Sequence, residues 1–252
     1  MSTFPAAQPA ASFVPDPSVG SAPGWPLVLY FHHVQPAIDH YTNLTPASFR
    51  RGLDLLLRFF EPVDPGALRA ETVRSFPGTR PRMLLTFDDG YRDLLADAVP
   101  ILNARGVKAI FFICTRLLGE RSDDPREDYL SWDDCERLRD AGHLVASHGL
   151  THTPLDRLTA VEAAHQVTGS LAELRHRLRL HSAVYAYPYG IEAPVPASVD
   201  GLGPLLAFGS VKAAPRPWAE APLSVRRTYL PAGGEQDWDE LVRGWRAGWE
   251  QP

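Results

Sequence analysis

Two adjacent acids and two histidines are the residues whose types and spacing could do chemistry. Asp88 and Asp89 end the apolar run 83–87, and Gly90 follows them at once. His148 and His152 are four residues apart, so one helical turn would point both imidazoles the same way. Two imidazoles and one carboxylate are a common binding set for a divalent metal ion, with coordination positions left open. The pattern therefore indicates a divalent-metal site.

Each half of this pattern also has a plainer alternative. The dipeptide Asp89-Gly90 is by itself typical of a surface turn, and an isolated pair of surface histidines is usually inert. Two carboxylates at the end of a buried strand are costly, however, unless something cationic compensates their charge. The presence of both the acid pair and the histidine pair favours the functional interpretation.

Strands and helices alternate along the chain. Helices are expected over 45–60, 92–105, 131–142, 159–178 and 236–249, and three of them begin at recognisable capping residues. Strands are expected at 26–31, 83–87, 107–113, 144–146 and 183–187, with weaker candidates at 205–211 and 225–230. This order predicts an α/β fold of about seven parallel strands, arranged as a barrel in preference to an open sheet.

The residues that could do chemistry come directly after predicted strands. They are His32, the acid pair, His148 and the segment 188–190. The carboxyl ends of parallel strands converge on one face of a barrel, and active sites lie on that face. We therefore expect these residues to form a single site.

Composition limits the classes of partner and the domain organisation. The chain has 252 residues, 44% hydrophobic and 22% charged, with net charge −5, which is ordinary for a globular protein. It has no cluster of basic residues interleaved with aromatics, so we expect no nucleic-acid partner. Residues 1–24 are rich in proline and alanine and are predicted to be a flexible tail, followed by one catalytic domain over 25–252.

Targeting signals and cysteines complete the compositional argument. No run of 18 apolar residues predicts a membrane span, and the first residues lack the basic start and apolar core of a secretory signal. A cytoplasmic location is the resulting expectation, although a substrate outside the cell would not suit it. Cys114 and Cys135 form no disulfide framework, and we interpret them as buried spectators.

Three stretches in this order resemble the polysaccharide deacetylase family, the NodB-type enzymes of carbohydrate esterase family 4. They are Thr86–Tyr91 (TFDDGY), Ser147–His152 with Leu155 (SHGLTH…L), and Ala186–Gly190 (AYPYG). The likeness extends from about residue 27 to residue 190. The family has a distorted (β/α) barrel and uses a divalent metal to remove acetyl groups from N-acetylated sugars.

The resemblance implies a role for each matching position. Asp89, His148 and His152 would hold one divalent metal ion, zinc in the first instance, with cobalt, nickel or manganese as alternatives. Asp88 would be the general base that takes a proton from the metal-activated water. Tyr189 would line the substrate groove beside a backbone N–H that stabilises the oxyanion, unless it is simply a packed tyrosine at the barrel rim.

The resemblance also implies a role for other residues of the same motifs. Pro188, Gly190 and Tyr91 belong to the same motifs and are assigned, with Tyr189, to substrate binding.

The chain departs from the family pattern at two positions. Many members carry an arginine that pairs with the base at the position of Ala186, so the cation here would have to come from Arg226 or Arg227. Many members also place the general-acid histidine near the C-terminus, and no histidine follows His181. The segment Phe31–Val34 (FHHV) matches a family branch that begins with Tyr-His-x-Val, which makes His32 the candidate acid. His33 is the competitor, but alternation along the strand should turn it away from the barrel axis. A core histidine at a strand end is the alternative for His32.

Together these features predict a metal-dependent hydrolase of linear amide C–N bonds that acts on an N-acetylglucosamine-type polysaccharide or oligosaccharide. Two alternatives remain at this stage: the same site acting on a small non-sugar amide, and a catalytically impaired carbohydrate-binding relative.

Overall fold

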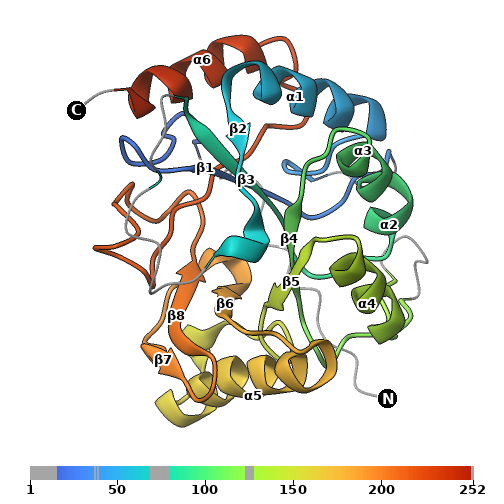
Figure 1. Cartoon of the computed structure of the whole chain (residues 1–252), viewed down its shortest axis with the longest axis vertical. Coiled ribbons are helices and arrows are strands. Elements are labelled where there is room, and N and C mark those ends of the chain that lie inside the picture. The colour runs from blue at the N-terminus through green and yellow to red at the C-terminus, as the bar shows by residue number, and fades with distance from the viewer. Residues whose placement is uncertain are drawn as a thin grey trace.

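Parallel strands form the centre of the molecule, and helices cover their outer side (Figure 1). The computed structural model describes residues 16–36, 38, 40–68, 76, 80–122 and 128–250. The strands are β1 Leu27–Phe31, β2 Glu61–Pro62, β3 Arg82–Phe87, β4 Ala109–Ile113, β5 Leu144–Ser147, β6 Ala183–Ala186, β7 Ser198–Val199 and β8 Gly203–Phe208. The helices are α1 Pro46–Phe59, α2 Asp93–Asp97, α3 Val99–Asn103, α4 Trp132–Asp140, α5 Ala160–Leu178 and α6 Trp238–Trp249.

The sheet follows the order β1-β3-β4-β5-β6-β8, with all these neighbours parallel. The two short strands that the sequence did not predict lie beside this path: β2 pairs in parallel with β3, and β7 is antiparallel to β8. Because all of these neighbouring strands are parallel, every carboxyl end on this path points to the same face. The predicted α/β fold of parallel strands is confirmed.

The segment 225–228 closes the barrel between the first and last strands of this order. Val225 pairs in parallel with β8 through Phe208, and Thr228 pairs in parallel with β1 through Leu29. The Thr228 N–H donates to Val28 O at 2.8 Å, and its carbonyl accepts from Tyr30 N–H at 2.9 Å. The weaker strand candidate at 225–230 thus exists as isolated bridges, which makes the barrel distorted at this seam.

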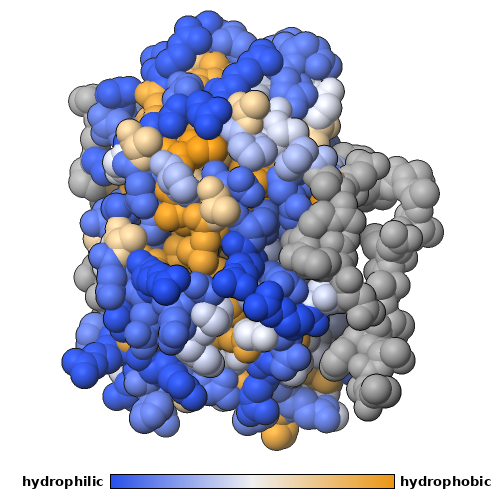
Figure 2. Space-filling view, turned by 90° about the vertical axis from the view of Figure 1, so that its right-hand side faces the viewer, coloured by the Kyte–Doolittle hydropathy of each residue, from blue (hydrophilic) through white to orange (hydrophobic). Residues whose placement is uncertain are grey.

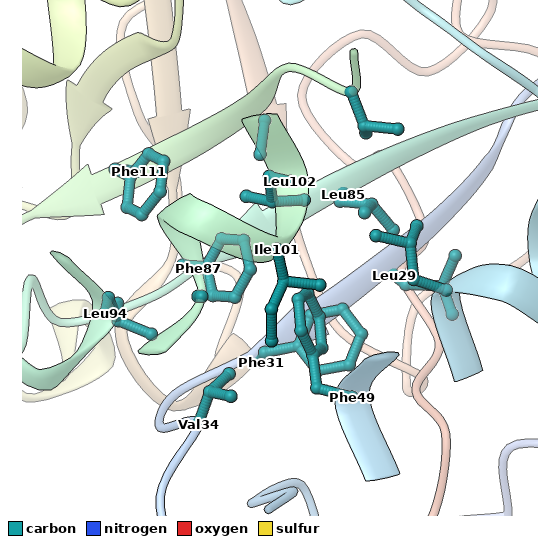
Figure 3. Packing of buried hydrophobic residues seen from close by; sticks show 14 of the residues in the cluster. Leu29, Phe31, Val34, Phe49, Leu85, Phe87, Leu94, Ile101, Leu102 and Phe111 are labelled. Atoms are coloured by element: carbon teal, nitrogen blue, oxygen red, sulfur yellow. The ribbon is translucent and has the colours of Figure 1, made fainter. Parts of the chain in front are cut away.

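Strand alternation sorts the buried side chains into an inner and an outer set. Leu29, Phe31, Leu85, Phe87 and Phe111 face outward and pack under the helices (Figure 3). The intervening residues, among them Val28, Leu84, Ile110, Phe112 and Ala146, form a second core inside the barrel. Side chains two residues beyond an inward position therefore also face inward. This register turns His32, Asp88 and His148 toward the barrel axis.

Most of the predicted helices begin where the capping residues indicated. The Thr45 side chain accepts from Ser48 N–H, and capping boxes form at Ser131 with Asp134 and at Thr159 with Glu162. The side of the barrel that carries α2, α3 and α4 presents a largely hydrophilic surface with an apolar area in its upper half (Figure 2).

The helix expected over 92–105 is instead two short helices, α2 and α3, separated at Ala98. Pro100 lies in the first turn of α3. A proline has no N–H to continue the preceding ladder, and its ring clashes with the previous turn, so a continuous helix was the wrong prediction. Gly106 nevertheless ends the stretch with φ 65°, as expected of a glycine beyond a helix.

Residues 16–24 pack against the barrel, contrary to the expectation that 1–24 is a flexible tail. The carbonyl of Pro17 accepts hydrogen bonds from Thr228 Oγ1 at 2.9 Å and from Trp245 Nε1 at 2.8 Å. Ala22 is buried, and Gly24 N–H donates to Trp249 O at 3.1 Å. A compositional argument weighs apolar side chains and overlooks anchoring of this kind, which uses the backbone. Residues 1–15 lie outside the described residues.

Removing residues 1–24 is therefore expected to destabilise the protein. A chain that starts at Trp25 loses the hydrogen bonds of the Thr228 hydroxyl and the Trp245 indole N–H to Pro17, each worth roughly 0.5–1.5 kcal/mol. The melting temperature should fall by about 2–12 °C relative to a chain starting at Asp16. Equal melting curves for the two chains would show that 16–24 adds no stability.

Candidate active site

A buried ion pair joins Asp88, at the end of β3, to Arg227 in the closing segment. The two guanidinium nitrogens donate to the two carboxylate oxygens at 2.6 and 2.8 Å, and Arg227 is only 1% exposed. The same guanidinium also donates to Thr86 Oγ1 at 3.1 Å and to Gly209 O at 2.7 Å. Burial is the largest single effect and would raise the pKa of Asp88, but the charge and hydrogen bonds of Arg227, together with His148 and His32, outweigh it, and the net pKa lies below the usual value. Asp88 is therefore held ionised.

The two arginines that the sequence left open have different partners. The Arg226 side chain lies on the opposite side of the segment and donates to the backbone carbonyls of Val19, Val211 and Ala213. Successive residues of an extended segment point to opposite faces, so only one of the pair can reach Asp88. The geometry makes Arg227 the partner of the predicted base. Arg227 supplies the cation that the side chain of Ala186 cannot supply.

Asp89 lies beside both histidines of the second motif. Its Oδ1 is 3.3 Å from His148 Nε2 and 3.0 Å from His152 Nε2, and the three residues offer ligand atoms within 4.8 Å of one another. Asp89 has φ 69°, so its carboxylate escapes the outward direction that strand alternation would give it. Burial would raise the pKa of Asp89, but the two imidazoles outweigh it and hold the pKa well below its usual value.

The donor atoms of this cluster fit a divalent cation. His148 Nδ1 is 2.8 Å from the carbonyl of Ala186, which can only accept, so this nitrogen carries the proton and Nε2 keeps its lone pair. Asp89 Oδ1 is buried and accepts no hydrogen bond. Two ligands of a tetrahedral zinc ion with bonds of roughly 2.0–2.2 Å lie about 3.3–3.6 Å apart, close to the spacings here. The residues present suit a metal ion of this kind.

The loop that carries the two histidines is held by two residues to which the sequence analysis assigned no role: Gln166, and Cys114, which was interpreted as a spectator. The Cys114 thiol donates to His148 O at 3.4 Å and accepts from the backbone N–H of His152. Gln166 Oε1, from α5, accepts from Leu150 N–H at 2.9 Å and from Thr151 N–H at 3.2 Å. The sequence does contain a signal for Gln166, since this polar residue lies among the apolar positions of α5.

His32 and His33 face different surroundings. His32 Nδ1 lies 2.9 Å from Thr42 Oγ1, and the charges of Asp89 and Asp88 act on its ring. Burial is nevertheless the largest effect and lowers the pKa of His32. His33 turns away, bonds Asp93 Oδ1 at 3.1 Å and stacks on Tyr91 at 3.8 Å between ring centroids. This is the alternation that the sequence predicts for the pair.

The residues assigned to substrate binding divide into two groups. Tyr189 is 52% exposed, has φ 59°, and its ring centroid lies 4.5 Å from that of His152. Pro188 is buried beneath it, and a Cβ at Gly190 would come within 2.4 Å of Ser210, so only glycine fits there. Tyr91 stacks between His33 and Tyr129, which gives its ring a packing role.

Residues 77–196 match the family model described as polysaccharide deacetylase. This matched segment, slightly less than half of the chain, is similar to the polysaccharide deacetylase family. A curated relative from Bacillus subtilis (strain 168), YxkH, is described as a polysaccharide deacetylase and is 27% identical over 108 residues. This match covers 43% of the present chain and 37% of the length of YxkH.

Solved structures share the fold of this chain. IcaB from Ammonifex degensii aligns with TM-score 0.72 and 23% identity, covering 90% of this chain and 99% of the other. The Streptococcus pyogenes deacetylase PplD, solved in complex with acetate, aligns with TM-score 0.69 and 19% identity, covering 88% and 97%. Within the described ranges, no helix is long and apolar enough to cross a membrane.

Replacing Arg227 should destabilise the protein far more than replacing Arg226. Arg227→Met leaves the buried Asp88 carboxylate without its cation, which costs about 3–5 kcal/mol. Arg226→Met removes bonds to neutral carbonyls and should cost about 1–2 kcal/mol. Denaturant unfolding of both variants measures the difference, and Asp88→Asn combined with Arg227→Met should recover part of the loss. Equal losses for the two arginines would contradict the assignment.

Proposed function

We propose that this protein hydrolyses the N-acetyl amide of an N-acetylglucosamine-type carbohydrate with the help of one divalent metal ion. The observation that carries the proposal is the position of the ionised Asp88 directly before Asp89, whose Oδ1 lies 3.3 Å from His148 Nε2 and 3.0 Å from His152 Nε2. A proton acceptor and a cation-binding set thus stand side by side on one face of the barrel. This juxtaposition suits hydrolysis of an amide by water.

Asp89, His148 and His152 would hold the metal, and zinc suits their mixed nitrogen and oxygen donors; cobalt, nickel and manganese are alternatives. A bound divalent ion of this kind lowers the pKa of a water molecule and polarises the amide carbonyl. The Cys114 thiol and the Gln166 side chain keep the ligand loop in place, so little reorganisation is needed.

Asp88 takes the proton from the attacking water. Arg227 keeps the carboxylate ionised and fixes both of its oxygens, so the base is charged and oriented before substrate arrives. His32, on the neighbouring strand, would donate a proton to the leaving amine, because an unprotonated amine anion is a very poor leaving group.

The sugar would lie against the exposed Tyr189 ring, beside His152. An exposed aromatic face gives a flat apolar surface for a pyranose ring next to the reacting amide. The structural neighbour PplD is described as a deacetylase in complex with acetate, the second product that this reaction would release. Its likeness supports acetyl transfer to water and leaves the polymer undefined.

The direct test is release of acetate from N-acetylglucosamine oligomers by the purified protein. Acetate should appear with zinc or cobalt present, stop after treatment with a chelator, and return when metal is restored. Binding of the oligomers without acetate release would favour the catalytically impaired relative. Release only from small non-sugar amides would instead place the same site in a different amidohydrolase.

Asp88→Asn and Asp89→Asn should fail for different reasons. Asp88→Asn removes a proton acceptor and leaves the ligand set whole, so metal content should stay near one equivalent while turnover falls about 10²–10⁴-fold. Asp89→Asn removes a charged ligand and should lose both metal and activity. Metal analysis of the two proteins after dialysis separates them, and the reverse pattern would show that the two roles are exchanged.

His32→Ala and His33→Ala should differ in the substrate on which they fail. An ester leaving group needs little protonation, so His32→Ala should lose amide cleavage while keeping much of its activity on an activated acetate ester. His33→Ala breaks the contact with Asp93 and should affect both substrates alike through stability. Equal losses of both activities in His32→Ala would make His32 a positioning residue.

A further inference from the structure

A chain of three polar side chains leads from the site to the surface through residues that none of the motifs contain. Thr42 Oγ1 lies 2.9 Å from His32 Nδ1 and also 2.9 Å from His40 Nδ1. Thr42 is fully buried, whereas His40 is exposed. The His32 and His40 rings meet edge to face, with centroids 5.3 Å apart.

Counting hydrogens gives the direction of each bond. The Thr42 backbone N–H donates to His40 Nδ1 at 3.4 Å, so this nitrogen carries a lone pair and no proton. The Thr42 hydroxyl must then also donate to His40, which uses its single hydrogen. Its oxygen can therefore only accept from His32, and His32 Nδ1 carries the proton.

We infer that Thr42, oriented by His40, fixes the tautomer and ring orientation of His32 so that Nε2 is the nitrogen presented to the reacting amide. This inference rests on the proposed function, in which His32 is the acid. An Nδ1–H is present in both neutral and protonated forms of this tautomer, so its bond to Thr42 persists while Nε2 gains and gives up a proton. The ring then needs no reorientation between turnovers. Thr42 and His40 are positioning residues for His32.

Nuclear magnetic resonance of the zinc-loaded, ¹⁵N-histidine-labelled protein reads the tautomer directly. Neutral His32 should carry its hydrogen on Nδ1 in the wild type and in Thr42→Ser, which keeps the hydroxyl. In Thr42→Val, which has nearly the same shape, the two tautomers should mix. His40→Asn, whose Oδ1 can replace the accepting nitrogen, should behave like the wild type, and His40→Leu like Thr42→Val. A wild-type His32 with its hydrogen on Nε2 would overturn the inference.

Activity supplies the second readout. Thr42→Val should keep its zinc and lose roughly 10–100-fold in amide turnover, with a smaller loss on the activated ester and recovery in Thr42→Ser. Adding Thr42→Val to His32→Ala should cause no further loss, since both act through one group. If His32→Ala loses amide turnover and Thr42→Val does not, the positioning inference is wrong. If His32→Ala keeps amide turnover, the acid role itself fails, and the tautomer measurement alone decides the inference.

Discussion

The buried pair of Asp88 and Arg227 is the interaction on which the rest of the site depends. It joins β3 to the segment that closes the barrel, 139 residues further along the chain. A lone carboxylate in this interior would take up a proton, and a lone guanidinium would leave a charge unpaired; each is stable only with the other. The pair therefore stabilises the seam of the barrel and keeps the base ionised by the same contacts.

The position of the cation also explains how the chain tolerates Ala186. In many members of the family that the sequence resembles, an arginine at that position pairs with the base from the strand of the third motif. Here Arg227 reaches the same carboxylate from the closing segment, and Ala186 contributes only its carbonyl, which holds His148 in one tautomer. What the site requires is a guanidinium in bidentate contact with Asp88, and neighbouring elements of a barrel can each supply it.

Much of this arrangement could be predicted from the sequence, because it follows from periodicity. Strand alternation places Asp88 inward and separates His32 from His33, and the parallel order brings the strand ends together. Periodicity cannot predict the residues whose backbone conformation departs from the regular strand or helix. Of the four described non-glycine residues with positive φ, three are Asp89, His152 and Tyr189, and all three lie at the site. Such strain depends on tertiary contacts, so no local pattern reveals it.

Supporting residues escaped prediction for a related reason. Gln166, Cys114 and Thr42 carry no charge and belong to no spacing pattern that a metal or a proton transfer demands. Their importance follows from which backbone and imidazole groups they meet after folding, as when one glutamine oxygen accepts two loop N–H groups. Residues that do chemistry are recognisable by type, whereas the role of the residues that orient them becomes clear from their contacts in the folded chain. Composition failed to predict the anchoring of segment 16–24 for the same reason. The Pro17 carbonyl holds this segment in place, and since every residue has a backbone carbonyl, residue type gives no sign of the contact.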